Sequence, residues 1–352
     1  MNKKVTIQDI ADALGISRNT VSKAINNSEG LADATREKIL QKAVEMGYKQ
    51  FSYAGSFAAV SGGAAPAGGE RPQAPGYQGE IALLTGSFLS HSHFASLMLD
   101  KFQREISQLG YTMNTHRVTA AEFANKTLPI TMNMEQIKAI MCIEMFDWDY
   151  DQMLCGLDIP ILFVDGPAKR GGRSLPADQL YMDNTTEITR FVNEMLEQGC
   201  TRIGFAGVYD HCQSFFERYT AFYLAMLTAG QKVDKRFVIQ PTSQMEYRKA
   251  IASMPELPDV FICANDFVAL DLIQALEECG KQVPRDVRIC GFDDSAESRF
   301  SKPSLTTVHI HTQVIAYSAV HLLISRIKEP SLDFRTIHTE TNLIYRDSTG
   351  TI

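Results

Sequence analysis

The chain has 352 residues, more than one compact domain usually holds, so we expect two or three domains. Hydrophobic residues make up 45% and charged residues 21% of the chain, which argues against a disordered chain, a collagen-like repeat or a long coiled coil. No segment approaches the roughly 20 apolar residues that span a bilayer, so we expect no membrane protein. The N-terminus has no apolar export segment, and the seven cysteines include no Cys-x-x-Cys motif. We therefore expect reduced thiols in the cytoplasm.

The net charge of −7 is unevenly distributed along the chain. Residues 1–50 contain eight Lys and Arg against six Asp and Glu, a net charge of +2, which leaves −9 for the other 302 residues. A mildly basic head on an acidic body suits a polyanion-binding module that is carried by a larger domain.

The first 48 residues predict three short helices. Thr6 and Asp9 have the spacing of an N-terminal capping pair, and apolar residues follow at helical spacing. Gly15 then supplies a turn, Ser17 can cap a second helix, and a third helix is expected over 33–47. Two short helices joined by a glycine-containing turn and braced by a third form a helix-turn-helix.

The second helix of the head has a polar outer side. Arg and Lys suit guanine, Asn suits adenine, and small hydroxyls suit phosphates, which together are the requirements of a major-groove reader. The alternative is a solvated polar face on a small helical bundle. The residues on this side are Arg18, Asn19, Thr20, Ser22 and Lys23.

Residues 61–79 predict a flexible linker between the head and the body. Gly, Ala and Pro make up 13 of these 19 residues, so the segment cannot bury enough apolar surface to offset the entropy of ordering.

The body, residues 80–352, alternates between strand-like and helix-like patterns. This rhythm predicts parallel, doubly wound sheets covered on both faces, and the length suits two such lobes. Strands are expected at 80–85, 138–144, 160–165, 179–183, 202–207, 259–264 and 286–291, and helices at 184–198, 213–229, 265–279 and 312–328.

Polar residues follow several of the predicted strands. Ligands of two-lobed doubly wound folds bind outside the carboxyl ends of the strands, which is where Asp165, Asn265 and Asp293 fall, with Arg218 nearby. Carboxylates accept hydrogen bonds from hydroxyls and a guanidinium donates a planar pair, so this set suits a neutral polyol such as a sugar. Asn265 and Asp293 could instead serve as helix caps.

Two histidine pairs, 91/93 and 309/311, have the alternation that can bind a metal on a strand. No Cys or third His lies at a matching spacing, and no motif of a nucleotide-binding loop, zinc protease, nucleophile elbow or calcium loop is present. We therefore expect no metal, no cofactor and no catalytic residues.

Several motifs together resemble the LacI/GalR family of bacterial transcription regulators. The head carries V-T-I-Q-D-I-A-D-A-L-G-I-S-R-N-T-V-S-K-A-I-N-N, then T-R-E-K-I-L and M-G-Y. The body carries V-D-G-P, M-D-N, C-A-N-D, V-P-R-D-V-R-I-C-G-F-D-D and P-S-L-T-T-V. The similarity covers the whole chain except the linker, at residues 5–27, 35–40, 46–48, 164–167, 182–184, 263–266, 283–294 and 303–308.

The resemblance implies roles in DNA binding. Base edges would be read by Arg18, Asn19 and Lys23. Residues 49–60 would form a hinge helix that places Ala54 and a Phe57 wedge in the minor groove. The Pro-Asn usual after the tyrosine is replaced here by Gln50 and Phe51, and the long linker is unusual. We therefore hypothesise looser coupling between ligand and DNA. Phosphates would be bonded by Thr6, Ser17, Ser22, Asn26 and Thr35.

The resemblance also implies an effector site between the lobes. Lobe 1 would span about 80–181 and 309–334, and lobe 2 about 182–308 and 335–352. The chain stops at 346–352 without an added heptad helix, so a homodimer is expected. The effector residues would be His93, Phe94, Asp165, Arg218, Asn265 and Asp293.

The implied function is a cytoplasmic repressor that a small-molecule effector, expected to be a sugar, releases from a pseudo-palindromic operator. Corepression is the first alternative. A solute-binding receptor would predict an export signal and no head. An enzyme would predict paired catalytic acids with a nucleophile or a metal.

Overall fold

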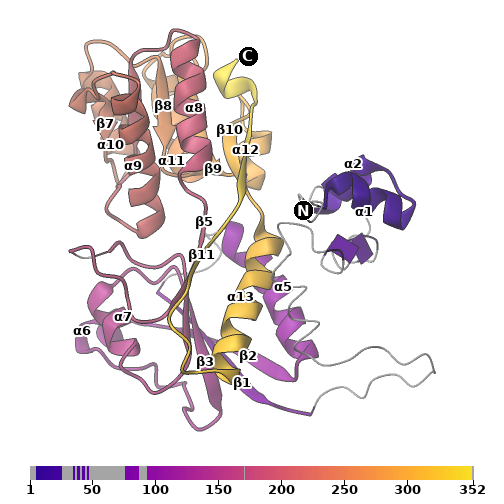
Figure 1. Cartoon of the computed structure of the whole chain (residues 1–352). Helices are drawn as coiled ribbons and strands as arrows, with labels where there is room; N and C mark the ends of the chain where they lie inside the picture. The colour runs from indigo at the N-terminus through magenta and orange to yellow at the C-terminus, as the bar shows by residue number, and fades with distance from the viewer. Residues whose placement is uncertain are drawn as a thin grey trace. The chain divides into compact units, whose positions relative to one another are not determined.

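The computed structural model describes residues 5–25, 35, 38–39, 42–43, 46, 76–86, 93–169 and 171–350 (Figure 1). Of the residues singled out above, Asn26, Gln50, Phe51, Ala54 and Phe57 lie outside the described residues, as does most of the predicted linker.

The chain divides into two compact units, each built from separate segments. The first comprises Met1–Val164, Leu175–Leu180 and His311–Thr339, and the second comprises Asp165–Ser174, Tyr181–Ile310 and Glu340–Ile352. The chain was expected to pass from one unit to the other near residues 182, 308 and 335. The last passage lies instead after Thr339, because the strand that precedes it, Thr336–Thr339, pairs within the first sheet.

The head in the first unit contains two described helices, α1 (Ile7–Leu14) and α2 (Arg18–Ile25). Thr6 and Asp9 form the predicted capping box at the start of α1. Gly15 ends the helix with φ of +66°, a left-handed conformation that glycine adopts without a Cβ penalty. The predicted helix-turn-helix is therefore confirmed.

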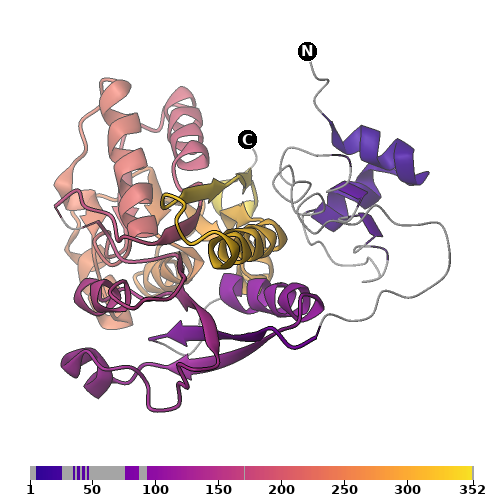
Figure 2. The same ribbon diagram turned by 60° about the horizontal axis from the view of Figure 1, so that its bottom comes forward.

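The rest of the first unit is a six-stranded sheet in the order β11-β5-β4-β3-β1-β2. The pairings among β1 to β5 are parallel, and the apolar runs of β1 and β3 are buried because helices cover the sheet. Figure 2 shows α5 and α13 side by side over this sheet. The strands are β1 (Gly79–Thr85), β2 (Tyr111–Arg117), β3 (Ile137–Ile143), β4 (Ile161–Val164), β5 (Asp178–Met182) and β11 (Thr336–Thr339), and the helices are α5 (His93–Gln108), α6 (Ala120–Asn125), α7 (Trp148–Leu154) and α13 (Thr312–Lys328).

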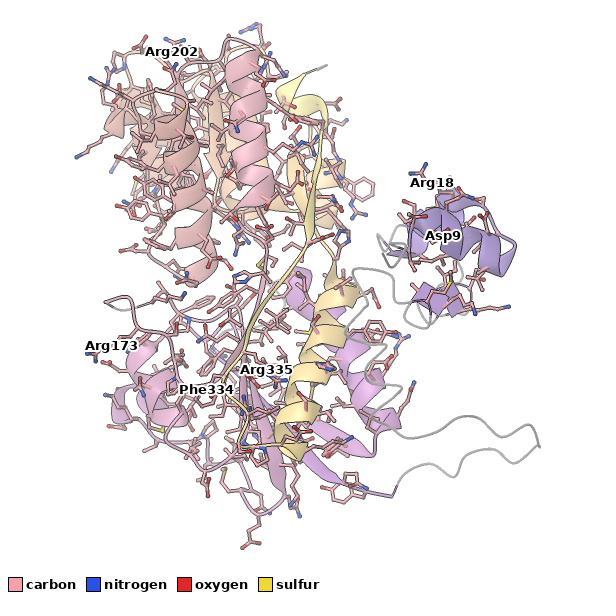
Figure 3. All side chains as sticks on the ribbon, viewed as in Figure 1. Asp9, Arg18, Arg173, Arg202, Phe334 and Arg335 are labelled. Carbon is pink, nitrogen blue, oxygen red and sulfur yellow. The ribbon has the colours of Figure 1, made fainter. Side chains whose placement is uncertain are left out.

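A buried carboxylate holds the end of α13 to the first sheet. Asp178 of β5 accepts hydrogen bonds from the guanidinium groups of Arg326 and Arg335. Arg335, labelled in Figure 3, also donates to Ser325 of α13. Burial alone would raise the pKa of Asp178, but the hydrogen bonds from the two arginines lower it. The ionised carboxylate therefore clamps three segments that are far apart in sequence.

The second unit repeats the architecture, with a sheet in the order β12-β10-β9-β8-β6-β7. Successive side chains of a strand point to opposite faces, so Phe205 of β6 packs on α9, whereas Ala206 packs with α10 and α11. β12 is antiparallel to β10. The strands are β6 (Ile203–Ala206), β7 (Val238–Ile239), β8 (Val260–Cys263), β9 (Arg288–Asp293), β10 (Thr306–Ile310) and β12 (Thr341–Ile344), and the helices are α8 (Thr186–Glu197), α9 (Gln213–Thr228), η3 (Lys235–Phe237), α10 (Gln244–Ser253), α11 (Asp266–Glu278), α12 (Ala296–Phe300) and η4 (Asp347–Thr349).

The predicted fold class, a helix-turn-helix followed by two parallel-sheet α/β lobes, is confirmed. Each strand and helix predicted for the body is present within a few residues of the expected bounds. None of the helices in the described part of the chain is long and apolar enough to cross a membrane.

Candidate nucleic-acid interface and ligand site

The core of the head fixes the orientation of α2. Ile10 and Ala11 of α1 and Val21 and Ala24 of α2 are fully buried, together with Ile39. Since Val21 and Ala24 face inward three residues apart, the opposite side of α2 must face outward.

The hydroxyl groups at the starts of the two helices serve as caps. The Thr6 hydroxyl donates to the Asp9 carboxylate at 2.6 Å, and the Asp9 backbone N–H donates back to it. The Ser17 hydroxyl oxygen accepts from the Thr20 backbone N–H at 3.1 Å and bonds the Thr20 hydroxyl at 2.7 Å. These bonds satisfy helix N–H groups that would otherwise lack partners.

The outward side of α2 carries Arg18, Asn19 and Lys23, all exposed, with Thr20 and Ser22 half-buried beside them. Figure 3 shows Arg18 at the surface of the head. Thr35 is helical and exposed. This face presents long cationic donors and an amide above a rigid core, which is the chemistry that base edges and phosphates require.

The second unit contains a buried arginine, Arg218 of α9, that is 2% exposed. Its Nε donates to the Asn184 side-chain oxygen at 2.9 Å, and one terminal nitrogen donates to the Ala264 carbonyl at 2.6 Å. Its guanidinium lies 3.5 Å from the centre of the Phe292 ring, a cation–π contact. Among the described residues, the other terminal nitrogen of Arg218 has no hydrogen-bond partner.

Asn184, which follows β5, connects Arg218 to two other side chains of α9. Its amide nitrogen donates to the Ser214 hydroxyl at 3.2 Å and to the Glu217 carboxylate at 2.8 Å. Glu217 also accepts from Gln213 at 2.9 Å. The amide group of Asn184 is thereby held in one orientation, with its oxygen toward Arg218.

Asp165 lies directly after β4 and is 9% exposed. Its carboxylate accepts from the Ser214 hydroxyl at 2.6 Å. Burial raises the pKa of Asp165, while the bond from Ser214 and the charge of Arg218 oppose the increase. Its φ of +53° is a left-handed conformation that non-glycine residues rarely adopt.

Two further predicted residues end neighbouring strands of the second sheet. Asn265 follows β8 and caps α11, because its side-chain oxygen accepts from the Val268 backbone N–H at 3.0 Å. Asn265 therefore serves as a helix cap, as the sequence also allowed, and its amide nitrogen can still donate to a ligand. Asp293 ends β9 with φ of +123°, and its carboxylate lies 3.9 Å from Arg218.

Asp165, Arg218, Asn265 and Asp293 thus belong to one unit, at the ends of β4, β8 and β9 and on α9. Carboxylate acceptors, an amide and a guanidinium donor can together bond several hydroxyl groups of one ligand. His93 and Phe94 belong to α5 in the first unit, where Phe94 is buried, and their role as effector residues stays a prediction.

Three residues of the cluster were not predicted as site residues: Asn184, Glu217 and Phe292. Ser214 lies four positions before Arg218, which is a usable helical signal, whereas Glu217 directly precedes Arg218 and its spacing carries no such signal. The stacking of Phe292 on Arg218 has no such signal, because β9 and α9 are about seventy residues apart in the chain.

No group of three or more His, Cys, Asp or Glu side chains in the described ranges could hold a metal ion. His309 is instead a partner of a buried carboxylate, since its Nδ1 lies 2.8 Å from Asp294. Despite burial, the bonds from His309, Arg299 and Arg346 lower the pKa of Asp294 to about 2.

Two family models match this chain. Residues 6–50 match the bacterial regulatory proteins of the lacI family, and residues 192–349 match the periplasmic binding protein-like domain. The first range contains the helix-turn-helix, and the second contains Arg218, Asn265 and Asp293.

Relatives match over almost the whole chain. The HTH-type transcriptional repressor PurR of Vibrio vulnificus (strain CMCP6) is 26% identical over 97% of this chain and 98% of its own length. The HTH-type transcriptional regulator GalR of Lacticaseibacillus casei is also 26% identical, over 97% of this chain and 99% of its own length.

Solved structures of regulators share the fold. The complex of the transcriptional regulator CelR with cellobiose has a TM-score of 0.67 at 20% identity, with 98% of this chain and 100% of that chain covered. The lac repressor dimer bound to operator and the anti-inducer ONPF has a TM-score of 0.65 at 20% identity, with 99% and 100% covered.

Proposed function

The chain belongs to the lacI family of bacterial regulatory proteins, and from this premise we propose that it is a homodimeric repressor released from its operator by a sugar. Members of this family are DNA-binding transcription regulators and not enzymes. We propose three further points: that the protein represses transcription, that its effector is a sugar, and that the residues named below have the roles given to them.

The base-reading residues in this proposal are Arg18, Asn19 and Lys23. Their exposure on one side of α2, opposite the buried Val21 and Ala24, supports this role. The hinge residues Ala54 and Phe57 would enter the minor groove. Phosphates would be bonded by Thr6, Ser17, Ser22, Asn26 and Thr35, and Thr20 would belong to the DNA-binding side of α2.

The single observation that carries the effector proposal is the state of Arg218. The side chain is 2% exposed and oriented by Asn184 and Phe292, and only part of its donors bond to residues that the structure describes. A fixed guanidinium near Asp293, in the unit that also contains Asp165 and Asn265, can donate to hydroxyl oxygens while the carboxylates accept hydrogen bonds from hydroxyl groups. A neutral polyol satisfies both kinds of partner at once.

The effector would control DNA affinity by binding one arrangement of the chain more tightly than the other. Such coupling is typically about 1–3 kcal/mol, or a 5- to 150-fold change in operator affinity. A homodimer places two heads on two half-sites, so the operator would be a pseudo-palindrome.

The test is to sequence fragments of genomic DNA that the purified protein retains without added ligand. A repressor released by an effector enriches a short pseudo-palindrome. A panel of mono- and disaccharides is then added to the protein bound to that sequence. Release by one sugar supports the proposal, while enrichment that requires a sugar would establish corepression instead. No enrichment under either condition would overturn operator binding by this chain.

A further inference from the structure

A pocket lies in the first unit where the strands β3 and β4 begin. Its volume is about 510 Å³, which is within the range of pockets that hold small molecules. Ile161 begins β4 and lines this pocket, whereas the predicted effector residue Asp165 follows the other end of the same strand. The pocket is therefore separate from the cluster around Arg218. We call it the β4 pocket, and the residues that line it include Lys138, Asp158, Ile159, Ile161, Arg326 and Phe334.

Apolar side chains make up much of the wall of the β4 pocket. Ile161 is 6% exposed, Ile159 is half-buried, and Phe334 is 58% exposed. The ring centre of Phe334, labelled in Figure 3, lies 5.1 Å from the guanidinium carbon of Arg326 in a cation–π contact. This contact positions the ring, and more than half of the side chain stays accessible. An aromatic ring in this state can pack on an apolar ligand.

The wall of the pocket is held in place without a ligand. The ring of a proline fixes φ near about −65°, so three prolines of the wall have little backbone freedom. Arg326 donates to Asp178 of β5 and to the Asp333 carbonyl, which joins the end of α13 to the segment that carries Phe334. A pocket that is already formed loses little conformational entropy on binding. The three prolines are Pro160, Pro176 and Pro330.

Two side chains of opposite charge in the β4 pocket are available to a ligand. Lys138 and Asp158 are both exposed, and neither side chain has an ion pair or a hydrogen bond in the described part of the chain. The charge of Arg326 is instead neutralised by Asp178, at 3.0 Å. Burial raises the pKa of the Cys155 thiol to about 12, so this lining residue is uncharged. The pocket therefore presents one ammonium group and one carboxylate group.

Gly79 positions the stem of Lys138. A Cβ at Gly79 would lie 2.5 Å from Cγ of Lys138, so the lysine stem occupies the space that any other residue would fill. The φ of Gly79 is +128°, which also favours glycine. Since β1 and β3 are neighbours in the sheet, the stem of Lys138 lies over the start of β1. The restricted stem loses less conformational entropy when its ammonium group pairs with a ligand.

We propose that the β4 pocket binds a free α-amino acid with an apolar side chain. The carboxylate of the amino acid would accept a hydrogen bond from Lys138, and its ammonium group would donate to Asp158. Its side chain would pack on Ile159, Ile161 and Phe334. Because Lys138 and Asp158 do not pair with each other, a ligand that carries both charges satisfies both residues at once. A ligand with only a carboxylate would be repelled by Asp158, and one with only an amine would be repelled by Lys138.

The exposure of the two charged residues sets the expected affinity. Ion pairs at exposed sites contribute little, because water competes for both charges. Most of the affinity would come from burial of the apolar side chain, so leucine and phenylalanine should bind better than glycine. We expect a dissociation constant on the order of 100 µM. The proposal does not rest on the repressor function, because neither the head nor Arg218 takes part in this site.

The experiment is a calorimetric titration of the full-length protein with L-phenylalanine and L-leucine, up to about 10 mM. At least one of the two is expected to bind. The comparison probes lack either the ammonium group (3-phenylpropionate, 4-methylpentanoate) or the carboxylate (phenethylamine, isopentylamine) and are expected to bind about ten-fold more weakly. Absence of binding by both amino acids would overturn the proposal. A probe that binds as tightly as its parent amino acid would overturn the assignment to a ligand with two charges.

Variants locate the binding site. Lys138→Met and Asp158→Asn are each expected to weaken binding about three- to ten-fold, and Phe334→Ala to weaken the binding of phenylalanine. Lys249→Met and Asp149→Asn remove the same charges from exposed positions outside the pocket and should leave the affinity unchanged.

Melting temperatures confirm that each variant is folded. Unchanged affinity in both Lys138→Met and Asp158→Asn would overturn the proposal, since the amino acid would then bind to another surface. Arg218→Met is expected to retain amino-acid binding. Loss of binding in this variant would overturn the proposal as well, because it would assign the amino acid to the effector site.

Discussion

In the described part of the chain, each unit buries one arginine, and the two arginines differ in how many of their N–H groups have acceptors on the protein. Arg326 in the first unit is 4% exposed, and all five of its N–H groups have acceptors, which are Asp178 and the carbonyls of Pro330, Leu332 and Asp333. Arg218 in the second unit is 2% exposed, but among the residues that the structure describes it donates only to Asn184 and Ala264. Its nearest carboxylate oxygen, on Asp293, is 3.9 Å away.

The difference separates a structural group from a binding group. A buried guanidinium whose donors all meet protein acceptors has no capacity left for a ligand, and it stabilises the segments that supply those acceptors. A buried guanidinium with remaining donors, aligned by a ring and an amide, is prepared for an external acceptor. Burial alone, which is nearly equal for the two residues, does not distinguish them.

The largest effect is expected from Arg326→Met. The substitution leaves Asp178 with only Arg335 and removes the donor of three backbone carbonyls, so we expect a loss of about 3–5 kcal/mol of unfolding free energy. Urea denaturation measures it. Lys328→Met, on the same helix but exposed, is the control and should change little. A loss of unfolding free energy as small as that of the control would show that Arg326 does not stabilise the fold.

Asp151 extends the comparison to carboxylates. It is fully buried on α7, and neither of its side-chain oxygens has a hydrogen-bond partner in the described part of the chain. Burial raises its pKa to about 8. The folded carboxyl therefore keeps a proton that the unfolded one, with a pKa near 3.8, loses, so stability falls as the pH rises from about 4 to about 8.

Asp151→Asn removes this titration. We expect the variant to exceed the wild type in unfolding free energy by roughly 2–4 kcal/mol near pH 8.5 and by almost nothing near pH 4. Asp149→Asn, exposed on the same helix, should show no such pH dependence. Thermal denaturation at a series of pH values measures the difference, and a difference independent of pH would show that Asp151 is ionised throughout.

Arg218→Met should have a smaller effect on stability than Arg326→Met, about 1–2 kcal/mol, because fewer protein acceptors lose a donor. It should abolish the rise in melting temperature that the releasing sugar causes in the wild type. Thermal shift with and without that sugar measures both quantities. Operator binding in the absence of sugar serves as the check on folding. A retained sugar response would exclude Arg218 from the effector site.

Arg18→Ala should have the smallest effect on stability, within about 0.5 kcal/mol, since the side chain is exposed. The substitution should instead weaken DNA binding. We expect a loss of about 1–3 kcal/mol of binding free energy at one operator position and relaxed specificity there. Binding to a set of operator variants measures it, with Gln8→Ala on the exposed side of α1 as the control. Uniform weakening on all sequences would indicate a phosphate contact instead.

The sequence predicted the body best where apolar periodicity is strong. The helix expected over 312–328 has those bounds, and the strands expected at 138–144 and 202–207 are displaced by only one or two residues. The strands β2, β7, β10, β11 and β12 were not predicted as separate elements. β2 and β11 are partly polar and lie at the edges of the first sheet, where only one neighbour contributes to their formation.

The candidate site was predicted only in part. Asp165, Arg218, Asn265 and Asp293 follow from the position of strand ends and from the family resemblance, and the structure assigns them to one unit. The links between them were not predicted, because Asn184, Ser214 and Phe292 come from three different elements. Contacts between residues that distant in the chain leave no periodic signal in a single sequence.

The sequence by itself determined the two kinds of module, because capping, turn and apolar patterns act over a few residues and persist in any fold that contains them. Only the tertiary structure decided which buried charges are structural and which can bind a ligand. Arg218 and Arg326 both lie on helices among apolar residues and are alike in sequence. The acceptors that distinguish them are supplied by β5, the end of β8 and the segment after α13, and only folding brings these acceptors to the two guanidinium groups.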